Sequence, residues 1–166
     1  MRTDPKRYLG IDIGLKGAFA ILSDENPTGV VMPVTGKTVD AYDIIKLIND
    51  YNPDHVVFEK LGVIFGSSKA TAFSMGSQSG IIEAACICAG VPYTPVKAKE
   101  WQKDMFTGVT EAKRSNGKRD TKAMALIACK RIFPNLELTM SARAVKPHDG
   151  YVDALLMAEW ARRKNL

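Results

Sequence analysis

The stretch YLGIDIG at residues 8–14 decides the fold of this chain. Leu9, Ile11 and Ile13 recur at every second position, which is the period of a β-strand with one apolar face. Asp12 falls on the other face, where a charge costs free energy unless it is paired or coordinated. The stretch therefore predicts a strand whose carboxylate has either a chemical role or the simpler role of capping a turn.

Beyond this stretch, the sequence contains further segments with the patterns of strands and helices. Runs of β-forming residues predict four further strands, at 17–22, 29–34, 55–59 and 93–96. Apolar residues at helical spacing, closed by Gly or Pro, predict five helices, at 40–51, 69–89, 97–106, 119–132 and 150–163. Residues 107–117 are predicted to be a polar loop. This order predicts an α/β protein, a five-stranded mixed sheet flanked by helices, in a single domain over residues 1–166.

Composition excludes several classes of protein. With 46% hydrophobic and 25% charged residues, the chain is neither disordered nor fibrous. The charged start of the sequence lacks the apolar core of a signal peptide, and no apolar run approaches the ~18 residues needed to span a bilayer. We therefore expect a cytoplasmic protein, in a bacterial or phage-infected cell, with no membrane partner.

Three cysteines are present, and none forms a CxxC pair. Cys86 and Cys88 lie in the apolar stretch 81–91, where a cysteine usually serves as a small core residue. The sequence therefore predicts structural cysteines rather than a metal or redox site.

The positive charge is concentrated in one segment. Residues 97–131 contain ten Lys and Arg against four Asp and Glu, whereas the rest of the chain contains thirteen against fourteen. Such clustering is typical of a surface that binds a polyanion. Charge alone also fits an ordinary solvated helix and loop, so both interpretations stay open at this point.

Further carboxylates stand where strands and helices end or begin. Glu59 closes the strand at 55–59, and Asp149 and Asp153 stand four apart at the start of the last helix, on one face. Two like charges at that spacing destabilise a bare helix by about 0.2–0.5 kcal/mol, which a bound cation would offset. Phosphodiester hydrolysis by two metal ions needs carboxylates from different elements, one ion activating water and the other stabilising the leaving oxygen. Together with Asp12, these residues predict a site for Mg²⁺, with Mn²⁺ able to substitute.

Motifs along nearly the whole chain resemble the RuvC family of Holliday junction resolvases, in the version carried by bacteriophages. The resemblance rests on YLGIDIG at 8–14, VVFEK at 56–60, GSQSGII at 76–82, PYTP at 92–95 and HDGYVDAL at 148–155. It implies an RNase H-like fold and a crossover junction endodeoxyribonuclease that nicks four-way DNA junctions symmetrically.

Carried over by position, the resemblance implies that Asp12, Glu59 and Asp153 are catalytic, metal-binding carboxylates. The family has an Asp or His three residues before the last Asp, and this chain has Gly150 there. Asp149 is our candidate for the fourth catalytic and metal-binding position, and His148 is the reserve.

The resemblance also gives the basic segment a role in DNA binding. Lys103 and Lys122 match family lysines near the scissile phosphate, and other cations would extend a phosphate track with little sequence information. Many family members carry an aromatic wedge three residues after the catalytic Glu, where this chain has Gly62. Phe65 is the nearest aromatic residue and would either stack on a base or anchor the loop. The predicted DNA-binding residues are Lys60, Phe65, Lys97, Lys99, Lys103, Lys113, Arg114, Lys118, Arg119 and Lys122.

Family members act as twofold dimers, so the resemblance implies a homodimer that binds branched DNA. The helix at 69–89 is the expected dimer surface, although its apolar residues fit a core position equally well.

Three alternatives are weighed against the resolvase. The stretch at 10–17 also resembles the first phosphate loop of actin-like ATPases and sugar kinases, but those proteins need two related halves and a second phosphate motif. A second alternative is an inactive DNA-binding module, which would be free to lose its carboxylates. The third is a broader debranching nuclease for branched DNA, linked to phage genome packaging.

Overall fold

The central sheet contains the five strands that the sequence predicts. The structure, a computed structural model, describes residues 5–23, 26–62 and 68–166. Across the sheet the order is β3-β2-β1-β6-β7, with β2 antiparallel to β1 and β3, and with β1, β6 and β7 parallel. The predicted mixed sheet is thus confirmed. Its strands are β1 (Tyr8–Asp12), β2 (Ala18–Leu22), β3 (Thr28–Val31), β6 (His55–Glu59) and β7 (Tyr93–Val96).

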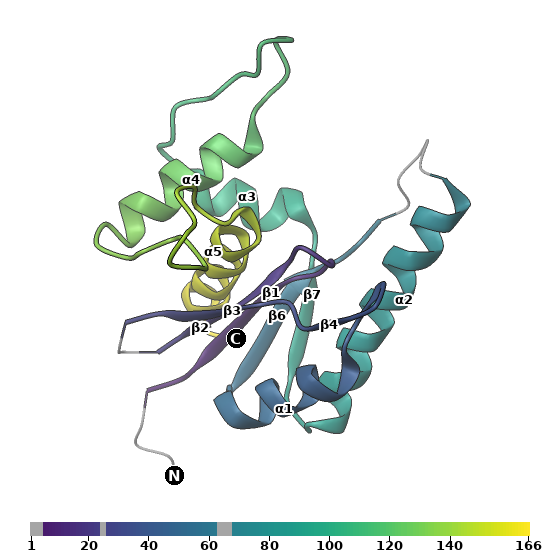
Figure 1. The fold of residues 1–166 in the computed structure, drawn as a ribbon. Helices are drawn as coiled ribbons and strands as arrows, with labels where there is room; N and C mark the ends of the chain where they lie inside the picture. Colours follow the sequence, from purple (N-terminus) through teal and green to yellow (C-terminus); the bar gives the residue numbers. More distant parts are fainter. Residues whose placement is uncertain (1–4, 24–25, 63–67) are drawn as a thin grey trace.

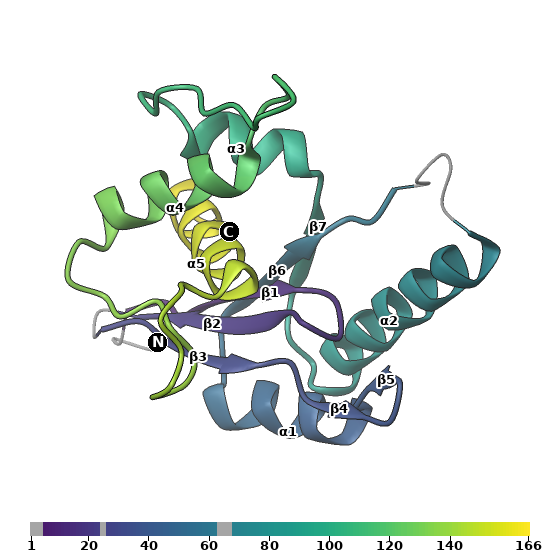
Figure 2. The same ribbon diagram turned by 45° about the horizontal axis from the view of Figure 1, so that its top comes forward.

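Helices cover both faces of the sheet, so the protein has three layers (Figures 1 and 2). One face carries the first two helices, and the other carries the last three, with α5 lying directly on the sheet. The helices are α1 (Ala41–Tyr51), α2 (Lys69–Cys88), α3 (Ala98–Met105), α4 (Thr121–Ile132) and α5 (Asp149–Lys164). Among helices in the described part of the chain, none has the length and apolar character that crossing a membrane requires.

Side chains on the sheet alternate between two cores. Leu9 and Ile11 are buried with α1 and α2, whereas Tyr8 and Ala20 are buried on the opposite face with α5. The alternation predicted for the first strand is therefore confirmed. It places Asp12 at the end of β1 on the face that α5 covers.

A glycine in β1 allows α5 to approach the sheet closely. A Cβ atom added to Gly10 would lie 1.9 Å from the carbonyl oxygen of Ala154 in α5. Because no side chain fits there, Gly10 lets the helix backbone rest on the strand. Apart from Asp149, Asp153 and its last three residues, α5 is buried. This packing brings Asp153 over the end of β1.

The segment before α4 differs from the prediction. The helix begins at Thr121 rather than at residue 119, because the side chain of Asp120 accepts a hydrogen bond from the Ala123 N–H at 3.1 Å and caps it. The predicted loop at 107–117 includes a hairpin in which Lys113 and Arg119 form an antiparallel bridge. A small second sheet of β4 (Val34–Thr35) and β5 (Thr38–Val39) was also not predicted.

The cysteine prediction is right for one of the two residues it names. Cys86 is buried and fills a core position between α2 and the sheet, as predicted. Cys88 is exposed, so its assignment to the core is wrong. Two residues along a helix turn the side chain through about 200°, and only one face of α2 covers the core.

Candidate metal and nucleic-acid site

Two of the predicted carboxylates meet at the carboxyl edge of the sheet. Asp12 is the last residue of β1 and Glu59 is the last residue of β6. These strands are parallel, and Ile11 pairs with Phe58, so the two acidic residues follow side by side. Both are half-buried. The strand ends therefore supply a pair of neighbouring carboxylates.

Asp153 joins this pair from α5. Burial, followed by the negative charge of Glu59, raises the pKa of Asp12 to about 7, and Lys122 opposes the rise. Burial is also the main cause that raises the pKa of Asp153 to about 7, followed by the charges of Asp12 and Glu59. Mutual effects of this kind require proximity, so the structure brings the three carboxylates predicted from the sequence into one cluster. Raised carboxyl pKa values in a hollow are typical of functional sites.

Trp101 is a neighbour of this cluster that the sequence analysis missed. Its indole N–H donates a hydrogen bond of 3.4 Å to Oε2 of Glu59. Burial raises the pKa of Glu59, and this hydrogen bond opposes the rise. The only sequence signal was an aromatic residue in a short helix that is mostly polar. Trp101 is itself buried, and this hydrogen bond links the Glu59 carboxylate to α3.

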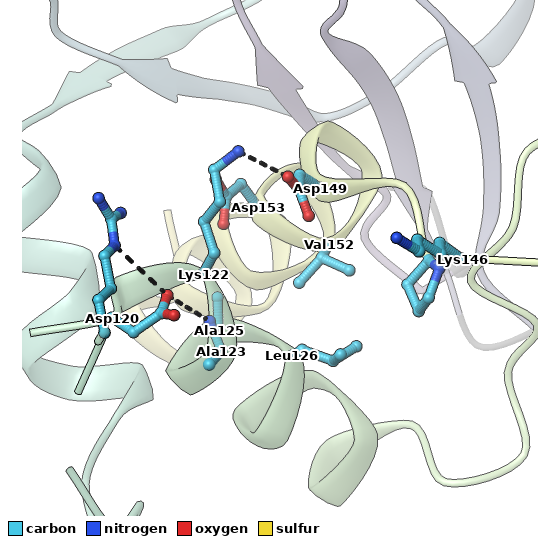
Figure 3. A pocket seen from close by; sticks show the side chains of 11 residues that line it. Asp120, Lys122, Ala123, Ala125, Leu126, Lys146, Asp149, Val152 and Asp153 are labelled. Atoms are coloured by element: carbon cyan, nitrogen blue, oxygen red, sulfur yellow. Dashed lines mark hydrogen bonds and ion pairs between the residues drawn. The ribbon is translucent and has the colours of Figure 1, made fainter. Parts of the chain in front are cut away.

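The fourth candidate, Asp149, lies at the rim of the cluster. Its Oδ2 is 2.6 Å from Nζ of Lys122, and both side chains are mostly exposed (Figure 3). His148, the reserve candidate, is the N-cap of α5, where its Nδ1 accepts a hydrogen bond from the Tyr151 N–H at 3.1 Å. That nitrogen is therefore used for capping, and Asp149 is the better placed of the two.

Gly150 occupies the position where the resembling family has an acid or histidine. A Cβ atom added to Gly150 would lie 2.6 Å from Oδ2 of Asp12 and 3.1 Å from Cα of Gly17. The turn that ends β1 thus fills the space that a side chain would need. The departure from the family pattern has a steric cause in this chain.

Gly150→Asp is accordingly expected to lower any metal-dependent activity of this site, although it restores the family's residue. The new Cβ would displace Asp12, and misplacement by about 1 Å can cost about 10²-fold in rate. Gly150→Ala is the matched control, because it adds the same Cβ without a carboxylate. Single-turnover cleavage rates of both variants should fall together. Wild-type activity in Gly150→Asp beside a defective Gly150→Ala would show instead that the added carboxylate acts as a ligand.

The donor set fits a hard divalent cation. A hollow of about 530 Å³ is lined by Asp12, Asp149 and Asp153, and all of their donor atoms are oxygens. Oxygen ligands are those that Mg²⁺ and Mn²⁺ prefer. Within the described ranges, no three His, Cys, Asp or Glu side chains already stand at the spacing of a metal cluster. A cation held by these carboxylates would therefore require their side chains to move, and the ion pair of Lys122 with Asp149 would open.

The predicted DNA-binding cations lie on the surface around α3, the hairpin and the start of α4. Lys99, Lys103 and Arg119 line a pocket of about 370 Å³ together with Gln102 and Phe106. Every predicted cation is exposed, and Phe65 lies outside the described residues. The exposed cations are Lys60, Lys97, Lys99, Lys103, Lys113, Arg114, Lys118, Arg119 and Lys122.

Comparisons with known proteins agree with the fold and the motifs. No protein-family model matches the sequence. RuvC, the crossover junction endodeoxyribonuclease of Brevibacillus brevis, is 31% identical over 110 residues, which cover 57% of this chain and 65% of that relative. The chain therefore spans slightly less than two thirds of the length of the curated relative it matches.

Solved structures give matches over almost the entire chain. The complex of T. thermophilus RuvC with a Holliday junction substrate matches with a TM-score of 0.68 at 16% identity, covering 96% of this chain and 94% of that one. The yeast mitochondrial Holliday junction resolvase Ydc2 matches with a TM-score of 0.61 at 13% identity, covering 96% and 79%. At such identities the likeness establishes the fold, which is the RNase H-like fold predicted from the sequence. The curated relative and these structures support the resemblance found in the sequence, and the chain has the fold of the RuvC proteins it is similar to.

Proposed function

We propose that this protein is a metal-dependent endonuclease that resolves four-way DNA junctions by paired, symmetric nicks. The observation that carries the proposal is the cluster of Asp12, Glu59 and Asp153, in which burial and mutual repulsion raise the pKa of two carboxyls to about 7. The exposed cations of α3, the hairpin and α4 offer a surface for a phosphate backbone. The relatives named above include a crossover junction endodeoxyribonuclease and a RuvC bound to a Holliday junction.

Each group in the site has a separate task. Asp12, Glu59 and Asp153 would hold Mg²⁺ or Mn²⁺, with Asp149 as the fourth ligand. Such cations neutralise the charge that develops on the attacking and leaving oxygens of a phosphodiester. Lys122 is paired with Asp149 at 2.6 Å, and it would turn to the scissile phosphate when a cation takes over that carboxylate. The expected product ends are 5′-phosphate and 3′-hydroxyl.

A cleavage assay on defined DNA shapes tests the proposal. A labelled four-way junction, a Y-shaped fork and a linear duplex of matched sequence are incubated with Mg²⁺, Mn²⁺ or EDTA. We expect paired nicks at symmetric positions of the junction, lost in EDTA, with little cutting of the duplex. Equal cutting of the junction and the fork would favour a debranching nuclease. Tight junction binding without cutting would favour an inactive module, and nucleotide binding would favour the actin-like alternative.

Electrostatic binding through α3 predicts a specific salt dependence. Lys103 is exposed and lines the basic pocket, so Lys103→Ala should weaken binding of junction and duplex alike and reduce the slope of log K against log [salt] by about 1. The matched control is Lys46→Ala, a lysine paired with Asp50 on α1, on the other side of the sheet. Fluorescence anisotropy at several salt concentrations measures both. The same slope for Lys103→Ala and wild type would exclude Lys103 from the DNA contact.

We also propose that two copies associate through α2. One face of this helix covers the core, while Phe73 is 79% exposed and Ile87 is 65% exposed elsewhere on it. Large apolar side chains exposed on a helix are typical of a protein interface. Phe73→Asp is therefore expected to raise the dimer dissociation constant by at least about 10-fold and to uncouple the two nicks. Sedimentation velocity of wild type and variant decides this, and a wild type that stays monomeric at tens of micromolar would contradict it.

A further inference from the structure

A second pocket adjoins the carboxylate cluster and has a different chemistry. It lies between α4 and the start of α5 and has a volume of about 590 Å³ (Figure 3). It shares Lys122, Asp149 and Asp153 with the hollow of the carboxylate cluster. The ion pair between Lys122 and Asp149 stands where the two spaces meet. Any strand bound at the carboxylates therefore has this pocket beside it.

The pocket has an apolar wall and a polar rim. Ala123 and Leu126 of α4 face Val152 of α5 across it (Figure 3), and Arg114 and Lys146 also line it. Arg114 is held near the pocket by Asp120, whose Oδ1 is 4.0 Å from the Arg114 Nε. Three carboxylic acids, Asp120, Asp149 and Asp153, stand among the three cations of the lining, so the pocket suits an uncharged group better than a phosphate.

The pocket at α3 differs in charge from the pocket between α4 and α5. It is lined by Lys99, Lys103 and Arg119 and by no carboxylate, as a phosphate contact requires. A DNA strand presents phosphates and bases alternately, so a nuclease needs separate places for the two. The two pockets match this division.

We propose that the pocket between α4 and α5 receives the base of one nucleotide flanking the scissile phosphate, unstacked from the DNA. This inference rests on the proposed function and adds how the substrate is selected. Proteins hold an extruded base by packing it against apolar or aromatic side chains and by hydrogen bonds to its edge, and the apolar wall and the Arg114 guanidinium of this pocket offer both. A base whose pairing or stacking is already weakened costs the least to extrude, as where a bound junction is opened at its branch point. The pocket therefore couples cleavage to branched DNA and makes the rate depend on which base enters.

Filling the pocket tests this role without removing a charge. Ala123→Phe places a ring in the space opposite Val152 and leaves the backbone N–H that bonds Asp120 in place. The control is Ile127→Phe, because Ile127 is a 48% exposed residue of α4 that does not line the pocket. The junction carries 2-aminopurine, whose fluorescence rises on unstacking, at either nucleotide flanking the mapped cut. Binding is measured in EDTA and cleavage in Mg²⁺.

Wild type and Ile127→Phe should raise the fluorescence at one of the two positions and cleave at the same rate. Ala123→Phe should bind the junction within about threefold of wild type, because its phosphate contacts remain, while losing the fluorescence rise and at least about 10-fold in cleavage rate. A wild type that cleaves without any fluorescence rise overturns the pocket's role, whatever the folding of the variant. An Ala123→Phe variant that cleaves like wild type overturns it as well. Neither of these two results contradicts the proposed endonuclease function. A wild type that neither binds nor cuts the junction overturns both.

Discussion

Asp12→Asn is expected to slow cleavage of a four-way junction by at least about 10³-fold and to leave junction affinity within about threefold. Asp12 lies at the centre of the cluster, beside Glu59 and under Asp153, and asparagine has the same shape without the charge that a cation needs. Losing several kcal/mol of stabilisation of the transition state corresponds to this factor. Binding depends instead on the cations of α3, the hairpin and α4, which the substitution leaves in place.

Single-turnover kinetics and anisotropy on the same labelled junction separate the two quantities. Asp43→Asn is the matched control, since Asp43 is an exposed carboxylate on α1, on the opposite face of the sheet. It should cleave like wild type. Cleavage by Asp12→Asn at more than a tenth of the wild-type rate would contradict the assignment of the catalytic site.

Without divalent cations, the protein is expected to become less stable as pH rises from about 5 to 8. The pKa values of Asp12 and Asp153 are raised from 3.8 to about 7, so between these values the folded state holds protons that the unfolded state releases. The stability that such a group contributes is fully present at pH values below its pKa in the unfolded state. It is lost as the pH rises through its pKa in the folded state, about 7. A pKa shift of this size corresponds to a loss of at most roughly 4 kcal/mol in the free energy of unfolding. This loss is shared between the two carboxyls, because the charge of each influences the other.

Urea unfolding in EDTA at several pH values between 5 and 8.5 measures this loss. Asp153→Asn should be more stable than wild type at pH 8 and less sensitive to pH, because it also relieves the repulsion on Asp12. Mg²⁺ should restore the stability of the wild type at pH 8, because a cation binds the ionised cluster of the folded state. It should change the stability of Asp153→Asn only slightly. Asp43→Asn again serves as the control. Parallel pH profiles for wild type and Asp153→Asn would contradict the raised pKa values.

Much of the fold could be predicted from local patterns. The alternation around Leu9 and Ile11 identified a strand with two different faces, and the structure buries those faces in two separate cores. The same pattern isolated Asp12 as a charge in the wrong place for a strand. Strand ends and helix starts are also where Glu59 and Asp153 stand, so three members of the cluster were visible from position alone.

The remaining features depend on contacts between distant parts of the chain. The hydrogen bond from Trp101 to Glu59 joins residues 42 positions apart, and no local sequence pattern indicates such a contact. The steric reason for Gly150 lies in the turn after β1, which only the packing of α5 brings near. Likewise, the second pocket forms only where residues of α4, α5 and the loop before α5 come together.

The hairpin before α4 is a different case, because its signal was present in the sequence. The Arg114 N–H donates to the Lys118 carbonyl and closes a three-residue hairpin loop, in which Gly117 has the positive φ of 78° that the last loop position favours. The side chain of Asn116 accepts a hydrogen bond from the Lys118 N–H at 3.1 Å. The flanking residues are charged rather than alternately apolar, which is why the stretch was predicted as a loop.

The central claim is that Asp12, Glu59 and Asp153 together bind a divalent cation, and titration with Mn²⁺ tests it most directly. Electron paramagnetic resonance counts free Mn²⁺ as it is added to wild type, Asp153→Asn and Asp43→Asn at pH 6 and pH 8. We expect wild type and Asp43→Asn to bind Mn²⁺ more tightly at pH 8 than at pH 6, because the cluster must ionise, and Asp153→Asn to lose at least about 10-fold in affinity. Equal Mn²⁺ affinity for all three proteins would contradict the central claim.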